Sequence, residues 1–250
     1  MSCNRLVKQR LVDVVAVVPA WNEAADVGRV VAGIRALGLD VIVVDDFSSD
    51  RTAAVARDAG ARVLRLPIHA GSWTAMQTGF RAALESGYDR VVTLDADGQH
   101  DPQDIPQLLS CAAGAERSER PPGVVIASCL SRGNRRRKLA WRFLRLLSGL
   151  GVADLTSGFR LYDREAVELL ASSECTLLEY QDVGVLLHLH RKGIRLAEFD
   201  VDMNPRCHGQ SRIFSSWRVV GHYLVYSALL SISRRHYGSR RTDVFAPGTG

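Results

Sequence analysis

The sequence has few cysteines, and their placement argues against both a zinc-binding domain and a disulfide-stabilised domain. The 250 residues contain five cysteines with no Cys-x-x-Cys pair. Scattered thiols of this kind favour neither a zinc site nor a disulfide framework, and they are typical of a chain in a reducing cytosol. There is also no internal repeat, no low-complexity block, and no run of the roughly 20 uninterrupted apolar residues that a membrane-spanning helix needs.

The bulk composition is that of a globular protein with a mild excess of basic residues. Hydrophobic residues make up 46% of the chain, the formal net charge is +5 and the isoelectric point is about 9.1. Such a chain can form one large domain or two small ones, and its charge suits phosphorylated ligands or an anionic membrane surface. The first 20 residues resemble a secretion signal, but Asp13 interrupts the apolar part, and we interpret the run as a first strand ending at Pro19.

Three valine-rich runs predict the centre of the fold. They occupy residues 12–20, 40–46 and 90–97, and each is continuously apolar, as parallel strands covered on both faces are. Segments with helical spacing separate them, and a short strand is expected at 62–67. This β-α-β order predicts the α/β class, with a mostly parallel central sheet flanked by helices. Farther along, we expect strands at 123–130 and 195–206, helix-containing units at 157–170 and 181–193, and an amphipathic helix with a basic tail over 214–250.

A basic amphipathic segment occupies residues 132–145. Besides Arg132, its basic residues are Arg135, Arg136, Arg137, Lys138, Arg142 and Arg145, interleaved with apolar residues that include Trp141 and Phe143. A solvated helix face is one interpretation, and nucleic-acid binding is another. An interfacial helix on anionic lipid better explains why aromatic residues accompany the arginines, so we expect a membrane surface and no nucleic acid as partner.

Polar clusters follow three of the predicted strands, at 19–23, 45–50 and 95–100. In open parallel sheets, ligands bind beyond the carboxyl ends of the strands. Each cluster alone is compatible with turn formation and helix capping, but several acids at one sheet edge repel each other unless a cation or a donor-rich ligand neutralises them. The first strand is not followed by Gly-x-Gly-x-x-Gly, which argues against an ordinary dinucleotide-binding domain.

The cluster after the third long strand predicts a metal site. Asp95 and Asp97 are two residues apart and would point the same way on an extended strand end, and Gln99 repeats the spacing. Two carboxylates and an amide oxygen suit Mg²⁺ or Mn²⁺ and leave positions for water and phosphate oxygens. Asp101, which precedes Pro102, is expected to begin the next helix instead. We interpret three histidines as structural: His100, His188 and His190.

Several motifs together resemble those of a known enzyme family. They are VVPAWNE (17–23), VVDDFSSDRT (43–52), LDADGQHDP (94–102), DLTSGFRLYDREA (154–166) and PRCHGQSR (205–212). In this order they resemble family 2 inverting glycosyltransferases of the A-type fold, in the branch of polyprenyl-phosphate (dolichyl-phosphate) mannose and glucose synthases. The resemblance covers residues 13–213 and implies one glycosyltransferase domain over 1–213. Residues 13–130 would form its nucleotide-sugar and metal half and 131–213 its acceptor half.

The resemblance implies a role for each matching residue. The base and ribose pocket would be lined by Pro19, Trp21, Asn22 and Glu23, with Asp45 or Asp46 reading the base. Asp95, Asp97 and Gln99 would hold Mg²⁺ or Mn²⁺ on the diphosphate of a UDP- or GDP-sugar. Arg132 and Arg206 would lie near phosphates, with Ser211 in the same late motif as Arg206. Thr156, Ser157 and Gly158 would lie beside the acceptor.

The chain departs from the family pattern at two places. Family members often have glycine where this chain has Phe47, and they often have an Asn with a small Gly-rich run where it has His69 and Trp73. These replacements bear on nucleotide or sugar preference. The long hydrophobic C-terminal spans of some relatives are absent from this sequence. The resemblance implies a cytoplasmic enzyme, peripheral on the inner face of the membrane, that can form homo-oligomers.

The expected reaction is displacement at the anomeric carbon with inversion, for which Asp97 and Arg132 would be catalytic. A lipid-phosphate acceptor is already an anion at neutral pH and needs no base. A sugar or small-molecule hydroxyl needs one, and Asp182 is then the candidate, with Asp154 second. Two other classes remain open: a non-catalytic module that binds nucleotide or lipid, and a metal-dependent nucleotidyltransferase. The paired acids argue against the first, and the lack of a Gly-rich loop after the first strand argues against the second.

Overall fold

Seven strands form one sheet in the part of the chain that the structure describes. The structure is a computed structural model, and it describes residues 13–115, 121–129, 150–176 and 183–203. The strand order across the sheet is β3-β2-β1-β4-β6-β5-β7, and β6 is antiparallel to both of its neighbours whereas the other pairings are parallel. The predicted α/β class with a mostly parallel sheet is therefore confirmed. The strands are β1 (Val14–Ala20), β2 (Asp40–Asp45), β3 (Arg62–Arg65), β4 (Arg90–Thr93), β5 (Val124–Ser128), β6 (Arg160–Tyr162) and β7 (Leu196–Asp200).

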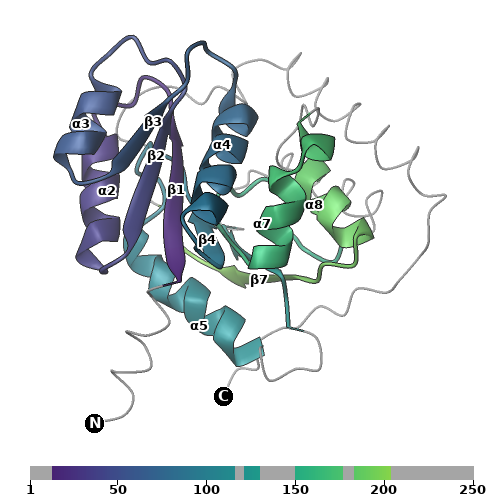
Figure 1. The fold of residues 1–250 in the computed structure, drawn as a ribbon. Helices are drawn as coiled ribbons and strands as arrows, with labels where there is room; N and C mark the ends of the chain where they lie inside the picture. Colours follow the sequence, from purple (N-terminus) through teal and green to yellow (C-terminus); the bar gives the residue numbers. More distant parts are fainter. Residues whose placement is uncertain (1–12, 116–120, 130–149, 177–182, 204–250) are drawn as a thin grey trace, which may run out of the picture.

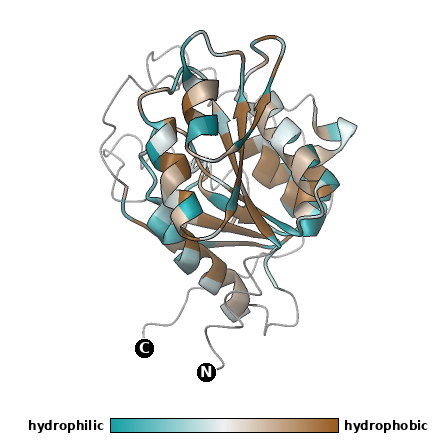
Figure 2. Cartoon of the chain, turned by 60° about the vertical axis from the view of Figure 1, so that its left-hand side comes forward, coloured by the Kyte–Doolittle hydropathy of each residue, from teal (hydrophilic) through white to brown (hydrophobic). Residues whose placement is uncertain are grey.

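The continuous valine runs become strands because both faces of the sheet are covered. All seven residues of β1 are buried, with Val15 and Val17 in one core and Ala16 and Val18 in the other. Figure 2 shows the result, with hydrophobic strands in the middle and hydrophilic residues concentrated on the outer sides of the helices. A strand between two apolar layers needs no polar face, which explains the lack of alternation in the sequence.

Helices form a layer on each side of this sheet (Figure 1). Residues of α4, α7 and α8 share one core with the sheet, and residues of α2, α3 and α5 share the other. Short 3₁₀ turns, η1 (Pro102–Asp104) and η3 (Ser173–Cys175), adjoin α5 and α7. The helices are α2 (Val27–Ala36), α3 (Thr52–Asp58), α4 (Ser72–Glu85), α5 (Ile105–Ala115), α7 (Arg164–Ala171) and α8 (Val183–Arg191).

The predicted helix ends are also confirmed where glycine marks them. Gly38 follows α2 with φ 82°, and Gly60 follows α3 with φ 97°. Glycine adopts this left-handed conformation without the steric cost that a Cβ imposes, so both positions terminate their helices cleanly.

One strand was not predicted, and one expectation was wrong. The helix-containing unit expected over 157–170 does contain α7, but Arg160–Tyr162 form β6 before that helix begins. Three residues are too few to reveal a period of two, so the sequence pattern could not distinguish this strand from a helix start. The strand expected over 90–97 ends at Thr93, and residues 96 and 97 lie in a turn.

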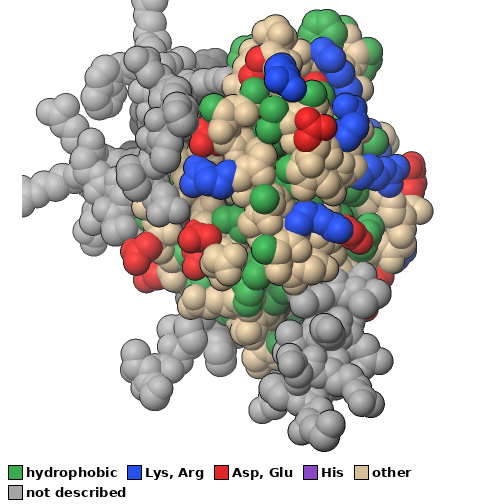
Figure 3. Space-filling view, turned by 90° about the vertical axis from the view of Figure 1, so that its left-hand side faces the viewer, with side chains coloured by type: hydrophobic (Ala, Val, Ile, Leu, Met, Phe, Trp, Pro, Cys, Tyr) green, Lys and Arg blue, Asp and Glu red, His purple; other side chains and the backbone are tan. Residues whose placement is uncertain are grey.

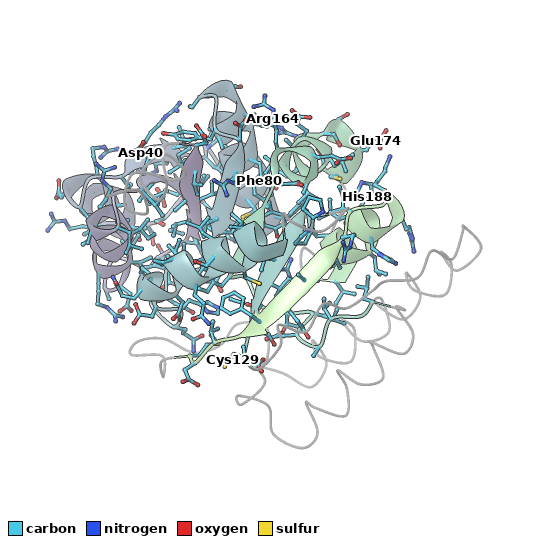
Figure 4. All side chains as sticks on the ribbon, turned by 90° about the horizontal axis from the view of Figure 1, so that it is seen from below. Asp40, Phe80, Cys129, Arg164, Glu174 and His188 are labelled. Atoms are coloured by element: carbon cyan, nitrogen blue, oxygen red, sulfur yellow. The ribbon has the colours of Figure 1, made fainter. Side chains whose placement is uncertain are left out.

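The core and the surface follow the usual division of side chains. Phe80 on α4 lies inside, edge-on to Tyr162 of β6 at 5.4 Å between ring centroids, whereas Asp40, Arg164 and Glu174 lie at the periphery (Figure 4). On the face carried by α2 and α3, basic side chains alternate with acidic ones (Figure 3). Among the described residues, no helix has both the length and the apolar character needed to cross a membrane.

Candidate active site

The carboxyl ends of β1, β2 and β4 meet at one edge of the sheet. In the parallel register, Ala20 pairs with Asp45, and Val17 pairs with Thr93. The loops that follow these strands therefore lie next to each other and carry the polar clusters predicted to form the site. Thr93 pairs with Arg160 of β6, which brings the segment that ends at Gly158 to the same edge.

The loops after β1 and β2 are joined by hydrogen bonds in both directions. The amide of Asn22 donates to Ser48 Oγ at 2.9 Å, and the amide of Ser49 donates to Asn22 Oδ1 at 2.8 Å. The amide of Glu23 donates to Thr52 Oγ1 at 2.8 Å. These hydrogen bonds join the two loops into one platform. Three of the residues predicted to line the base and ribose pocket, Trp21, Asn22 and Glu23, are partly exposed on it.

Asp45, at the end of β2, is fully buried and engaged in local contacts. Its Oδ1 accepts a hydrogen bond from the Ser48 amide at 3.1 Å, and its Oδ2 lies 3.3 Å from Nε of Arg65. Arg65 also donates to the Ser48 carbonyl at 2.8 Å. The carboxylate therefore holds the turn after β2 against β3.

Asp46 is 2% exposed and fastens the loop that precedes α4. Its carboxylate accepts from the amides of Ala70 at 2.7 Å and Gly71 at 2.9 Å, and its Oδ2 lies 2.9 Å from Nδ1 of His69. The His69 ring in turn stacks on Trp21, with ring centroids 4.2 Å apart and planes at 22°. The pattern had marked His69 as a departure from the family but had given it no role; its contact with Asp46 could not be inferred from spacing.

The two other departures have structural explanations. Phe47 has φ 61°, a left-handed conformation that favours glycine, and this ring is 49% exposed with the Arg65 guanidinium 5.7 Å from its centroid. Trp73, by contrast, is buried in the core, and its Nε1 donates to the Cys175 carbonyl at 2.7 Å. Phe47 therefore lies at the rim of the site, whereas Trp73 joins α4 to η3.

The predicted metal ligands follow β4 but do not continue it. The chain turns at residues 96 and 97, and Gly98 has φ 69°, so Asp95 and Asp97 do not project from one extended strand. Asp95 is exposed, whereas Asp97 is 4% exposed and its Oδ1 accepts from the Gln99 amide at 3.0 Å. Gln99 is itself buried. The carboxylate of Asp95 is therefore open to solvent, whereas that of Asp97 is buried.

Gly158 provides the room in which the Asp95 carboxylate lies. A Cβ at position 158 would lie 3.1 Å from both carboxylate oxygens of Asp95, closer than ordinary contacts. The Gly158 carbonyl accepts from Thr93 Oγ1 at 2.8 Å, which fixes the loop in this place. Thr93 was not anticipated as a site residue, because a buried threonine within a strand gives no sequence signal.

These residues fit a hard divalent cation by their chemistry. Asp95, Asp97 and Gln99 offer only oxygen donors among their metal-binding atoms, as Mg²⁺ and Mn²⁺ prefer. Over the described ranges, no three or more His, Cys, Asp or Glu side chains form a metal-binding group. A cation bound here would therefore take part of its coordination from ligand oxygens or water.

Asp154 anchors the predicted acceptor loop. Its Oδ2 accepts from the Cys129 amide at 3.2 Å, and its Oδ1 accepts from both the amide and the hydroxyl of Thr156 at 3.0 Å. The Ser157 Oγ accepts from the Phe159 amide at 3.3 Å. Thr156 and Ser157 thus use their hydroxyls within the loop. No helix begins in the described residues directly after Asp154, so its contacts stabilise a turn and do not match helix capping, the alternative explanation for this residue.

Glu198 on β7 completes this side of the edge and was not predicted. Its Oε2 accepts from the amides of Ala153 at 2.7 Å and Asp154 at 3.3 Å. Burial raises the pKa of Glu198 above its ordinary value, and the nearby Asp154 and Asp200 add to the rise. An acid in the middle of a strand was the only available signal.

The remaining predicted residues divide into two groups. Asp101 caps η1 as expected, with its Oδ1 accepting from the Gln103 amide at 2.9 Å. His100 is buried against Phe159, with ring centroids 5.2 Å apart. The predictions that lie outside the described residues concern Arg132, Asp182, Arg206, Ser211, the basic segment 132–145 and the tail 214–250.

Comparison with known proteins shows which protein family this chain resembles. The model of Glycosyl transferase family 2 matches residues 15–170. The chain is 29% identical over 241 residues to an undecaprenyl-phosphate mannosyltransferase of Micrococcus luteus, with 91% of this chain and 97% of the relative covered. It is 31% identical over 213 residues to a polyprenol monophosphomannose synthase of Mycolicibacterium smegmatis, with 80% of each covered.

A solved structure has the same fold. Glucosyl-3-phosphoglycerate synthase from Mycobacterium tuberculosis, in complex with Mn²⁺, UDP and phosphoglyceric acid, superposes with a TM-score of 0.64 at 21% identity. The match covers 94% of this chain and 82% of that one. The family model spans more than half of the chain, so the protein belongs to glycosyltransferase family 2 and is a glycosyltransferase.

Proposed function

We propose that this enzyme transfers a sugar, with inversion, from a UDP- or GDP-sugar to a polyprenyl phosphate, and that it requires Mg²⁺ or Mn²⁺. The two relatives described above are named for transfer to undecaprenyl phosphate and for polyprenol monophosphomannose synthesis. The neighbouring solved structure holds Mn²⁺ and UDP. A metal ion and a nucleotide bound beside the acids and loops at the carboxyl edge of the sheet would be consistent with these three proteins.

The platform formed by the loops after β1 and β2 would receive the nucleoside. Pro19, at the end of β1, precedes Trp21, Asn22 and Glu23, and the last two donate their backbone amides to hydroxyls of the second loop. Because these contacts already fix the loops, little ordering entropy remains to be lost when the donor binds. The platform would therefore set the position of the ribose relative to β4.

The diphosphate would lie beside the turn after β4. Asp95 and Asp97, with Gln99, would hold the divalent cation, which when bound neutralises charge that grows on the departing nucleoside diphosphate. The protein's own contribution is to keep an exposed carboxylate and a buried one on a short turn. Gly158 leaves Asp95 room, and Thr93 fixes Gly158.

The single observation that carries the proposal is the contact between Asp95 and Gly158. Asp95 belongs to the predicted donor and metal side, whereas Gly158 belongs to the loop predicted to lie beside the acceptor. A methyl group placed on Gly158 would crowd both Asp95 oxygens at 3.1 Å. The two substrates of a direct displacement must come this close, because their reacting atoms meet at about 3–3.5 Å.

A lipid-phosphate acceptor would need no general base. Its second pKa is about 6, so the phosphate is already a nucleophilic anion at neutral pH. Arg132 and Arg206 would position it by charge-assisted hydrogen bonds, and the basic segment 132–145 would keep the enzyme at the inner face of the membrane. A hydroxyl acceptor would instead need a base, and Asp182 is the residue proposed for that role.

The test is a transfer assay with the full-length protein, Mn²⁺, a set of labelled UDP- and GDP-sugars, and undecaprenyl phosphate in detergent. We expect labelled lipid from one donor, no product in EDTA, and loss of product in Asp97→Ala. The variant Asp182→Asn should retain most of the transfer to the lipid phosphate. Product formation in EDTA would refute the metal requirement, and loss of lipid transfer in Asp182→Asn would refute the base-free mechanism.

A further inference from the structure

The loops proposed to receive the nucleobase contain a histidine that is held in one orientation from two sides. The ring of His69 stacks on Trp21 at 4.2 Å, and its Nδ1 lies 2.9 Å from Oδ2 of Asp46. Trp21 follows β1, Asp46 follows β2 and His69 follows β3, so three neighbouring loops converge on one ring. A side chain that belongs to one loop and contacts two others has little freedom to rotate.

The carboxylate of Asp46 is poorly placed to meet a ligand directly. It is 2% exposed, and it already accepts hydrogen bonds from the amides of Ala70 and Gly71 as well as facing His69. The His69 side chain, in contrast, is 48% exposed. Of this pair, the imidazole is the group that an incoming base can reach.

The hydrogen bond at one ring nitrogen determines what the other can do. Nδ1 of His69 lies 3.3 Å from the backbone carbonyl oxygen of Asp46 and 2.9 Å from its Oδ2. Both oxygens only accept, so Nδ1 carries the hydrogen, and in the neutral ring Nε2 is then an acceptor. The two nitrogens lie on different sides of the ring, so Nε2 faces away from Asp46. In the described part of the chain, Nε2 has no hydrogen-bond partner of its own.

We propose that His69 reads the nucleobase of the donor by accepting, at Nε2, the ring N–H of uracil or guanine, with Asp46 fixing its tautomer and Trp21 its plane. Uracil carries N3–H between two carbonyls, and guanine carries N1–H. The equivalent nitrogens of cytosine and adenine have no hydrogen and offer a lone pair that would face the Nε2 lone pair. The proposal rests on the proposed use of a nucleotide-sugar donor and narrows the base to the two that present a donor.

Matched pairs of nucleotides test this inference. UDP and CDP have the same size and differ at the ring nitrogen and the neighbouring exocyclic group, and GDP and ADP provide the corresponding purine pair. Binding of each, with Mn²⁺, to the full-length protein is measured by titration calorimetry. We expect the wild type to bind UDP over CDP, or GDP over ADP, by at least about tenfold, the scale of one hydrogen bond with its mismatch penalty.

Variants at position 69 separate recognition of the nucleobase from the contact of this residue with Asp46. The side-chain amide of His69→Asn can still donate to Asp46 but has nothing at Nε2, so discrimination should fall about tenfold. His69→Gln places an amide oxygen near Nε2 and should retain most of the preference. His69→Phe keeps a ring against Trp21 without any nitrogen and should lose it. Ile68→Ala, a change at the 65%-exposed neighbour, is the control and should bind as the wild type does.

Each outcome decides between the proposals. Unchanged discrimination in both His69→Asn and His69→Phe would overturn the role of His69, as would a wild type that binds all four nucleotides equally. In that second case the nucleotide-sugar reaction itself would survive. If the wild type bound none of the four in the presence of Mn²⁺, the proposed donor would be wrong and the inference would fail with it.

Discussion

Gly158 lies against the carboxylate of Asp95, in a space that a side chain at position 158 would crowd. A Cβ there would lie 3.1 Å from each carboxylate oxygen. The contact joins the loop that follows β4, which carries Asp95, to the segment that precedes β6, which carries Gly158. A change at position 158 should therefore be felt at the predicted cation, although glycine offers no ligand to it.

Gly158→Ala should weaken Mn²⁺ binding, because the added methyl must push the Asp95 carboxylate or the loop aside. We expect a loss of about tenfold in affinity, the equivalent of about 1.4 kcal/mol. Titration of Mn²⁺ in the presence of UDP, followed by the EPR signal of the free ion, measures this directly. Gly114→Ala on α5 is a matched control, since a Cβ there meets nothing within 4 Å. Equal affinity in both variants would remove Gly158 from the account of the site.

Asp154→Ala should destabilise the protein by about 2 kcal/mol, because amide and hydroxyl donors would be left without their acceptor. The Asp154 carboxylate accepts from Cys129 and from two groups of Thr156. Asp154→Asn keeps one oxygen and should lose about half as much. Urea unfolding gives both values. An Asp154→Asn variant that is as stable as the wild type but inactive would instead support the role as a base.

Glu198 should make stability depend on pH. Burial raises its pKa in the folded protein. The stability contributed by the protonated carboxyl is therefore fully present below the ordinary pKa of a glutamate and is lost as pH rises through the raised value. Glu198→Gln resembles the protonated form, so it should match the wild type near about pH 4 and become the more stable protein toward neutral pH.

Melting temperatures measured across this pH range test the Glu198 prediction. Glu174→Gln is the control, because that carboxylate is 70% exposed and the ion pair that it forms with Nζ of Lys192 is long at 3.5 Å. Its difference from the wild type should stay small at every pH. A difference for Glu198→Gln that did not change with pH would show that the partly buried carboxyl of Glu198 does not titrate in this range.

Gly79→Ala should be destabilising by about 1–3 kcal/mol, because its Cβ would overlap Cγ1 of Val17 on β1. This runs against helix propensity, which favours alanine over glycine inside α4. Shortening the partner should relieve the overlap, so the double variant Gly79→Ala/Val17→Ala should lose less stability than the two single losses added. Strict additivity in urea unfolding would mean that α4 shifts away from the sheet instead.

The sequence determined the sheet more readily than the site. Strands such as β1 are buried on both faces, and a run of valines is sufficient to identify them. The three residues of β6 are too short to show any period. The turn at Asp95 and Asp97 was missed because Gly98 could equally have followed an extended strand; its φ of 69° depends on the surrounding loops.

The partners of individual side chains were even less accessible to prediction. Asp46 and His69 are separated by 23 residues, and only the parallel pairing of β2 with β3 brings them together. Glu198 meets Asp154 for a similar reason, across β7 and the loop before β6. Motifs identified Asp46 and Asp154, but the contacts of all four residues depend on topology that no local pattern contains.

The interlocked loops after β1 and β2, which we propose receive the nucleoside, would limit how this enzyme can change its donor. The backbone amides of Asn22 and Glu23 donate to the hydroxyls of Ser48 and Thr52, so replacing either hydroxyl residue disturbs both loops. Among the described residues, the segment just after β3 is held by the amide of Leu66, which donates to the Asp45 carbonyl, and by the amides of Ala70 and Gly71, which donate to the Asp46 carboxylate. Variation in donor choice among close relatives should therefore accumulate in that short stretch, where a single substitution changes chemistry without dismantling its neighbours.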